Sequence, residues 1–470
     1  MALLLDLTPL RTSPSFRRLW WGLGISNLGT QLTVVAVGLQ VYSITGSTLA
    51  VGILGLCALV PLVALGLYGG ALVDAYDRRT VAIASAVSLW VVSIVLAVQG
   101  WLHVDSVLVL YLLVALQSAG FAINNPARSA IIPRLIDPHL LPAANVLQTI
   151  AWNIALTAGP LLGAFLVATW DYGEAYTIDA LLFTAALWAL WKLPHLPPVA
   201  TPVPGAPGSG AGAAGEAAAG EAVAGSRGGV AAESADGAGG TDGVSQPAPA
   251  QSGLASVVEG LRYLATRPNV RMTFVVDLIA MILAMPRVLF PAVGVLFLGG
   301  GAATTGILSA AFAAGAVLAG LFSGGLVKIR WQGRVIGVSI ACFGLAVAGF
   351  GLVLVSVGAT APATRLGGAI VLASVFLALA GASDAISSVF RQTILQSATP
   401  DNMRGRLQGV FIVVVAGGPR LGDLVLGSGA TWLGEDWAAV LGGLACTTLL
   451  AVVLLRQRRF LQYDAHAPVP

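Results

Sequence analysis

The chain has 470 residues, a formal net charge of +3, 57% hydrophobic residues and only 10% charged residues. Soluble domains carry about 25% charged residues, so this chain has too few charges to cover a globular surface. The composition excludes a soluble protein and a disordered one, and it indicates an integral membrane protein that has the lipid bilayer around it.

Runs of about 20 mostly apolar residues are long enough to span a bilayer as helices. Twelve such runs occur, six in each half of the chain, at residues 19–43, 48–72, 80–101, 107–127, 143–168, 175–191, 270–298, 303–327, 335–357, 367–389, 407–430 and 437–455. The sequence therefore predicts an all-α membrane protein with twelve transmembrane helices in two pseudo-symmetric six-helix bundles.

The composition changes sharply between the two halves. Residues 201–250 contain no Leu, Ile, Phe, Met, Trp or Tyr, and Ala and Gly supply 28 of these 50 positions. Such a segment cannot bury enough surface to fold. We expect a first bundle at 1–192, a disordered acidic linker at 193–253, and a second bundle at 254–470 that begins with an amphipathic helix on the membrane surface.

Lysine and arginine are distributed unequally between the predicted loops. Twenty-one of the 24 basic residues fall on the side that carries the termini, one falls on the opposite side (Arg365), and two fall inside predicted helices (Arg287 and Arg420). Basic loops stay in the cytoplasm. This predicts a multi-pass protein of the cell (plasma or inner) membrane with both termini in the cytoplasm.

The two halves repeat each other in short motifs. Gly52-Ile-Leu matches Gly306-Ile-Leu, and Gly159-Pro160-Leu-Leu-Gly163 matches Gly418-Pro-Arg420-Leu-Gly422. Duplicated bundles on one chain are typical of transporters that rock one half against the other.

The loop between the second and third predicted helices reads Gly70-Ala-Leu-Val-Asp74-Ala-Tyr-Asp77-Arg78-Arg79. This pattern resembles the loop signature of the major facilitator superfamily: a glycine, three residues, an aspartate, then basic residues. The resemblance implies the major facilitator fold. It also implies that Gly70, Asp74, Arg78 and Arg79 act as a gating latch that holds one conformation. Ala75 and Asp77 depart from the pattern, and a solvated basic loop is the alternative.

The fifth predicted helix contains Gly159-Pro160-Leu-Leu-Gly163. This resembles the end of the antiporter signature of drug-exporting members of the superfamily, although Ala155 replaces one of its glycines. The resemblance favours export over import. Close packing of small residues between helices is the alternative interpretation of Gly159, Pro160 and Gly163.

Several charges lie within predicted membrane helices, where each needs a partner or a cavity. Asp277 and Arg287 lie in the seventh helix, too far apart along the axis to pair with each other. We expect Pro286 to kink this helix, Arg287 to contact substrate and Asp277 to couple protons. Further candidates for substrate or proton coupling are Asp384, Arg420 and Asp423. Because Arg420 and Asp423 are three residues apart, a structural pair between them is the alternative.

Arg128 and Arg391 end equivalent predicted helices, and Arg404 lies in the segment that follows Arg391. At helix ends these arginines can stabilise the helix dipole or pair with acids such as Asp137 and Asp401. The segments around Arg128 and Arg404, Asn125-Pro-Ala-Arg128 and Asp401-Asn-Met-Arg404, are similar to the branch of the superfamily that holds the enterobactin exporter and the macrolide efflux proteins. Gating and structural roles are favoured for the three arginines over catalysis.

Taken together, these features predict a secondary active transporter, not an enzyme, without cofactor or metal, and with no nucleic acid as partner. We expect a monomer that exports amphipathic organic molecules such as siderophores, macrolides or other drugs by proton-coupled alternating access. A lysophospholipid flippase or an importer of the same fold remains an alternative. A non-transporting membrane receptor or scaffold, with the acidic linker as its interaction segment, is a second one.

Overall fold

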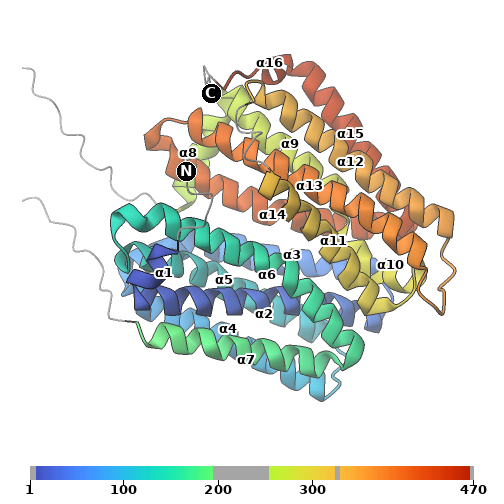
Figure 1. Ribbon diagram of the computed structural model, residues 1–470, viewed down its shortest axis with the longest axis horizontal. Coiled ribbons are helices and arrows are strands. Elements are labelled where there is room, and N and C mark those ends of the chain that lie inside the picture. The colour runs from blue at the N-terminus through green and yellow to red at the C-terminus, as the bar shows by residue number, and fades with distance from the viewer. Residues whose placement is uncertain (1–6, 194–252, 323–328, 466–470) are drawn as a thin grey trace, which may run out of the picture. The chain divides into compact units, whose positions relative to one another are not determined.

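The computed structural model describes residues 7–193, 253–322 and 329–465, which form helices joined by short loops (Figure 1). The described helices all fall in one compact unit of the chain. The predicted linker at 193–253 lies almost wholly outside the described residues, so its disorder stays a prediction.

The first bundle contains six long helices that match the first six predicted spans (blue to green in Figure 1). They are α2 (Pro14–Thr45), α3 (Thr48–Ala75), α4 (Arg78–Trp101), α5 (Val107–Ile131), α6 (Leu141–Thr169) and α7 (Tyr172–Trp191). Three short elements accompany them: α1 (Thr8–Thr12), η1 (Ile132–Arg134) and η2 (Pro138–Leu140).

The second bundle also contains six spans, and its first span is built from three pieces. The spans are α9 (Pro268–Ala284) with η3 (Pro286–Leu289) and α10 (Phe290–Leu296), then α11 (Gly301–Phe322), α12 (Gln332–Val357), α13 (Gly367–Ser397), α14 (Asp401–Leu433) and α15 (Glu435–Arg456). The short α8 (Gly253–Thr266) precedes them and α16 (Arg458–Leu461) follows. The prediction of twelve helices in two bundles is confirmed.

Ten of these helices are long and apolar enough to cross a membrane by length and composition alone, within the described residues. The other two spans are α7 and α14. They carry buried charges inside the helix, Asp179 in α7 and Asp423 in α14. A buried charge lowers the hydropathy of a span without excluding it, provided that the charge has a partner inside the bundle.

The first span of the second bundle is broken at the predicted place. Helix α9 ends at Ala284, Met285 is extended (φ −79°, ψ 101°), and Pro286 begins the 3₁₀ turn η3. Proline removes a backbone donor and clashes with the preceding helical turn, so the chain cannot continue as one helix. The break turns Arg287 out of the regular helix and toward α14.

Helix pairing is the same in the two bundles. In the first bundle α2 packs on α6 and α7, α3 packs on α5, and α4 packs on α5 and α7. In the second bundle α9 packs on α14 and α15, α11 packs on α13, and α12 packs on α13 and α15. The sequence repeat therefore corresponds to a repeat of packing, as expected for a duplicated bundle.

Two helix pairs provide most of the packing between the bundles, α3 with α14 and α6 with α11. Near the loop at residues 46–47, Thr48 Oγ1 donates a hydrogen bond to Glu435 Oε1 at 2.7 Å. The backbones come so close that a Cβ placed on Gly52 would lie 2.5 Å from the carbonyl oxygen of Asp423. Glycine at position 52 therefore allows the close approach of α3 and α14.

The predicted amphipathic helix is present as α8, and it packs on α14, α9 and α3. Leu264 is buried in the core of the second bundle, whereas Val258 and Leu261 are exposed. The placement of α8 on a membrane surface stays a prediction.

Just before α12, Arg330 Nη2 lies 2.7 Å from Asp464 Oδ2, and this ion pair raises the pKa of the Arg330 guanidinium.

Candidate functional site

The first charged cluster lies in the second bundle and contains Asp277, Arg391 and Asp384. Arg391 of α13 donates a hydrogen bond from Nη1 to Asp277 Oδ1 of α9, and its Nη2 lies 3.6 Å from Asp384 Oδ1. The side chains of Arg391 and Asp277 are 5% and 4% exposed, and that of Asp384 is 25% exposed. Two carboxylates thus share one buried cation, and the cluster carries one negative charge when all three groups are ionised.

The cluster corrects two expectations for Arg391. Helix α13 runs on to Ser397, so Arg391 lies inside the helix and not at its end. Its described partners are Asp277 and Asp384, two carboxylates within membrane spans, in place of the helix end and the loop acid that were expected. Asp384 lies seven residues, or two turns, before Arg391, so both point to the same face of α13.

The second charged cluster lies at the break between α9 and α10. Arg287 donates two hydrogen bonds to Asp423 of α14, from Nε to Oδ1 at 3.2 Å and from Nη2 to Oδ2 at 3.0 Å. Two parallel bonds of this kind are the strongest geometry for an arginine–carboxylate pair. The Arg287 side chain is 42% exposed, whereas that of Asp423 is 12% exposed.

The alternative pair between Arg420 and Asp423 is wrong, because Asp423 is bound to Arg287. Arg420 lies one turn before Asp423 on α14, and no hydrogen bond or ion pair of its side chain occurs within the described part of the chain. The cluster therefore holds two arginines and one aspartate, and it keeps one positive charge.

The third charged group, Arg128, lies alone in the first bundle. It is 6% exposed, and its Nη1 donates a hydrogen bond of 3.2 Å to Ser26 Oγ of α2. Its Nε and Nη2 have no hydrogen-bond partner within the described residues, where no carboxylate contacts it either. The pairing expected with Asp137 does not form, and Asp137 is exposed.

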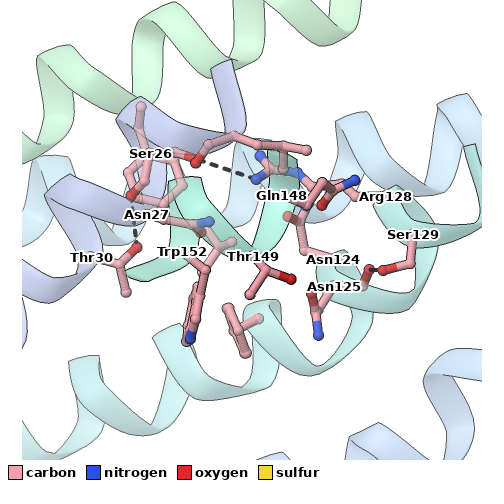
Figure 2. A pocket seen from close by; sticks show the side chains of 14 residues that line it. Ser26, Asn27, Thr30, Asn124, Asn125, Arg128, Ser129, Gln148, Thr149 and Trp152 are labelled. Atoms are coloured by element: carbon pink, nitrogen blue, oxygen red, sulfur yellow. Dashed lines mark hydrogen bonds between the residues drawn. The ribbon is translucent and has the colours of Figure 1, made fainter. Parts of the chain in front are cut away.

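Arg128 lines a cavity of about 260 Å³ (Figure 2). Its wall contains Arg128, eight polar residues of α2, α5 and α6, and three aromatic rings from α5, α6 and α7. The polar residues are Ser26, Asn27, Thr30, Asn124, Asn125, Ser129, Gln148 and Thr149, and the rings are those of Phe121, Trp152 and Phe183.

Sequence reasoning missed this cavity, although a signal was present. Polar residues recur at helical spacing inside apolar spans, at 26, 27 and 30 in α2 and at 124, 125 and 128 in α5. Residues three and four apart lie on one helix face, so each set forms a polar stripe that must face a cavity or another polar stripe.

The predicted latch is described only in part. The backbone of Gly70 and Asp74 belongs to α3 and that of Arg78 begins α4, but the side chains of Asp74 and Arg78 lie outside the described residues. Arg79 Nη2 donates a hydrogen bond of 2.7 Å to the Trp191 carbonyl at the end of α7. Asp77 accepts a hydrogen bond from the Thr80 amide at 2.9 Å and so caps α4, which explains an aspartate at this position.

The latch itself stays a prediction. The role of Arg404 also stays a prediction, because its side chain is outside the described residues.

The Gly-Pro segment of α6 lies against α2. A Cβ on Gly159 would lie 2.5 Å from Gln31 Cβ, and a Cβ on Gly163 would lie 2.6 Å from the Leu32 carbonyl oxygen. Pro160 lies inside α6, which continues through it. These contacts give Gly159 and Gly163 a packing role; an antiporter role for the segment stays a prediction.

Among the comparisons with known proteins, a family model matches the first bundle and individual relatives match nearly the whole chain. Residues 5–203 match a family model described as a transmembrane secretion effector. An enterobactin exporter of Citrobacter koseri is 28% identical over 471 residues, covering 99% of this chain and 97% of the relative. A second enterobactin exporter, from Shigella boydii, is also 28% identical, covering 98% of this chain and 96% of the relative.

Solved structures have the same fold at low identity. The nucleoside transporter NupG has a TM-score of 0.67 at 13% identity, with 94% of this chain and 99% of that chain covered. A bacterial homologue of the iron transporter ferroportin has a TM-score of 0.63 at 13% identity, with 94% and 98% covered.

The chain is a membrane transporter with the major facilitator fold. Its resemblance to the enterobactin-exporter branch is confirmed, and it is not an enzyme. It is a multi-pass protein of the inner membrane. Among the described residues, no group of three or more His, Cys, Asp or Glu side chains could hold a metal ion.

Proposed function

We propose that this transporter exports an amphipathic organic molecule in exchange for protons, by alternating access of a site between the two bundles. The named relatives support a siderophore-like cargo, since two of them are enterobactin exporters. The observation that carries the proton coupling is the sharing of Arg391 by Asp277 and Asp384.

The shared arginine gives a simple route for proton uptake. With both carboxylates ionised the cluster has one excess negative charge, and burying an unbalanced charge is costly. One proton on either carboxylate makes the cluster neutral, and the remaining carboxylate keeps Arg391. Because Asp277 is on α9 and Asp384 is on α13, the protonated site decides whether Arg391 ties these two helices together or bonds within its own helix.

Arg287 and Asp423 form a second bond between helices in this proposal. The pair joins the broken first span of the second bundle to α14, which packs on α3 of the first bundle. Arg420, close by on the same helix, supplies a positive charge for an anionic part of the cargo. Asp74, Arg78 and Arg79 act as the latch at the cytoplasmic end, and the linker at 193–253 serves as a tether.

The test uses everted vesicles with an imposed acid-inside gradient and a dye that reports internal pH. Adding a catecholate siderophore or a macrolide should release protons from vesicles that hold the wild-type protein. The Asp277→Asn and Asp384→Asn variants should bind cargo but release few or no protons. Asp464→Asn, which alters the ion pair with Arg330 outside the spans, is the matched control and should behave as wild type.

Two outcomes would contradict the proposal. Cargo uptake that is independent of the proton gradient would remove proton coupling, and would favour a uniporter or a lipid flippase of the same fold. Normal proton release by both Asp277→Asn and Asp384→Asn would remove the Arg391 cluster as the coupling site.

The proposed orientation has its own test in intact cells. Single cysteines at Ala363 and Arg458 replace exposed residues at opposite ends of the spans. A membrane-impermeant maleimide should label the cysteine at 363 in intact cells and the cysteine at 458 only in everted vesicles. The reverse pattern would place the termini outside the cell.

A further inference from the structure

Arg128 and Arg391 occupy equivalent places in the two bundles but have different partners. Each lies on the fourth span of its bundle, α5 or α13, and each reaches the first span, α2 or α9. Arg391 finds Asp277 there, whereas Arg128 finds Ser26. Seven residues before Arg391 is Asp384, and seven residues before Arg128 is Phe121. The first bundle has thus kept the arginine without either of its acids.

A buried cation without a carboxylate is costly. On the membrane-insertion scale an arginine at mid-span costs about 2.5–3.5 kcal/mol, which is an upper bound for Arg128 because it lies in the last turn of α5. Arg128 is as deeply buried as Arg391, with 6% and 5% exposed. Its single hydrogen bond to a hydroxyl leaves its charge and two of its nitrogens unsatisfied within the described residues. Such a group fits a negatively charged ligand that comes and goes.

The cavity next to Arg128 supplies the remaining contacts for such a ligand. The side-chain amides of Asn27, Asn125 and Gln148 line it, and they make no hydrogen bond within the described part of the chain. Amides can donate to the oxygens of an anion. The rings of Phe121, Trp152 and Phe183 form an apolar wall suited to an aromatic ring. Among the described lining residues there is no carboxylate that would repel an anion.

The size of the cavity limits what it holds. Pockets for whole drug-sized molecules have volumes of about 300–1,000 Å³, and this cavity has about 260 Å³. It therefore holds one ring with its acidic group, and the rest of a larger molecule extends past the exposed rim residues Asn125, Ser129 and Thr149.

We propose that this cavity is an anion subsite that binds the acidic group of an aromatic organic acid, with Arg128 as the charged contact. Its role as part of the cargo site rests on the proposed export function, whereas binding itself does not. Because the subsite lies in the first bundle and the proton-coupling cluster in the second, the two can be disabled separately.

The test measures binding without any gradient. Full-length protein in lipid nanodiscs is equilibrated with radiolabelled benzoate, the smallest aromatic acid, and neutral benzamide is the competitor. The wild type should bind benzoate saturably, and benzamide should not displace it. Arg128→Gln should weaken benzoate binding at least about tenfold, since a hydrogen bond to a charged group is worth that much. Arg128→Lys keeps the charge and should retain most of the binding.

A second variant keeps Arg128 and gives it an internal partner. Ser26→Asp places a carboxylate where the second bundle has Asp277, next to the Arg128 guanidinium. It should neutralise Arg128, raise the melting temperature and abolish benzoate binding. This variant tests the proposal even if Arg128→Gln fails to fold. Arg330→Gln, which removes an exposed arginine, is the control and should bind as wild type.

The outcomes separate this inference from the proposed function. Asp277→Asn should lose proton coupling and keep benzoate binding. The proposal is overturned if the wild type shows no saturable benzoate binding, if benzamide competes equally, or if Ser26→Asp binds benzoate as well as the wild type does. If transport does not depend on the proton gradient but benzoate still binds through Arg128, only the proposed proton coupling is overturned.

Discussion

Arg391 binds Asp277 across two helices of the second bundle, while its counterpart Arg128 binds, among the described residues, only the hydroxyl of Ser26 in the first. The two arginines are about equally buried, and they differ in the charge of their partners. The second bundle has an arginine shared by two carboxylates, a cluster that becomes neutral when it takes up one proton, and the first bundle has a cation without a described carboxylate beside a cavity. Duplicated bundles have thus acquired different electrostatics on the same packing.

The contrast predicts opposite effects on stability. Arg391→Gln leaves Asp277 and Asp384 without their cation and should reduce the free energy of unfolding by about 3–5 kcal/mol. Arg128→Gln removes a cation that has no acidic partner and should leave the melting temperature unchanged or raise it. Thermal unfolding of both purified variants in detergent measures this. A large loss of stability in Arg128→Gln would mean that Arg128 holds the first bundle together.

The Arg287–Asp423 pair predicts a coupling energy between α14 and the break in the first span of the second bundle. Arg287→Gln and Asp423→Asn should each destabilise the protein, because each leaves the partner charge alone. The double variant should be less destabilised than the sum of the two, by about 0.5–3 kcal/mol. The measurement is the free energy of unfolding of the wild type, the two single variants and the double variant, which together form a double-mutant cycle. Strictly additive effects would show that the bidentate contact does not contribute.

Two helical glycines predict opposite responses to one added methyl group. A Cβ on Gly163 would meet the α2 backbone at 2.6 Å, whereas a Cβ on Gly66 would meet nothing within 4 Å. Gly163→Ala should therefore destabilise by about 1–3 kcal/mol through overpacking. Gly66→Ala should be neutral or stabilise by about 0.5–1 kcal/mol, since alanine loses less conformational freedom. Equal melting temperatures for the two variants would argue against close packing of α6 on α2.

The hydrogen bond from Thr48 to Glu435 is expected to hold the two bundles together at the end where α3 begins. Thr48→Val removes the donor while keeping the shape of the side chain. A hydrogen bond to a charged group is worth about 1.5–3 kcal/mol. Its loss should therefore increase about tenfold the fraction of molecules in which the two bundles are separated at this end. Thr45→Val is the control, since Thr45 Oγ1 donates to the Val41 carbonyl at 2.7 Å and accepts from the Ser47 amide at 3.2 Å, both within the first bundle.

The readout is labelling of a cysteine at position 49, in a background where Cys57, Cys342 and Cys446 are replaced by alanine. Thr48→Val should label faster with an impermeant thiol reagent than Thr45→Val does. Identical labelling rates would show that the bond does not hold the bundles together at this end.

The sequence by itself determined the number and order of the spans. An apolar run of about 20 residues has few alternatives to a membrane helix, and Pro286 breaks a helix through its own covalent structure. The family resemblance was also visible in local motifs such as Gly70 to Arg79. These properties depend on neighbours along the chain, so they can be recognised without knowing which helices meet.

Only the tertiary structure decided the partners of the buried charges. Sequence spacing suggested Arg420 for Asp423 and a helix end for Arg391, yet Asp423 binds Arg287 from 136 residues away and Arg391 binds Asp277 from 114 residues away. An ion pair between helices depends on their rotation and crossing, which packing of the whole bundle sets. For the same reason the Arg128 cavity, built from five helices, emerged only when those helices were placed together.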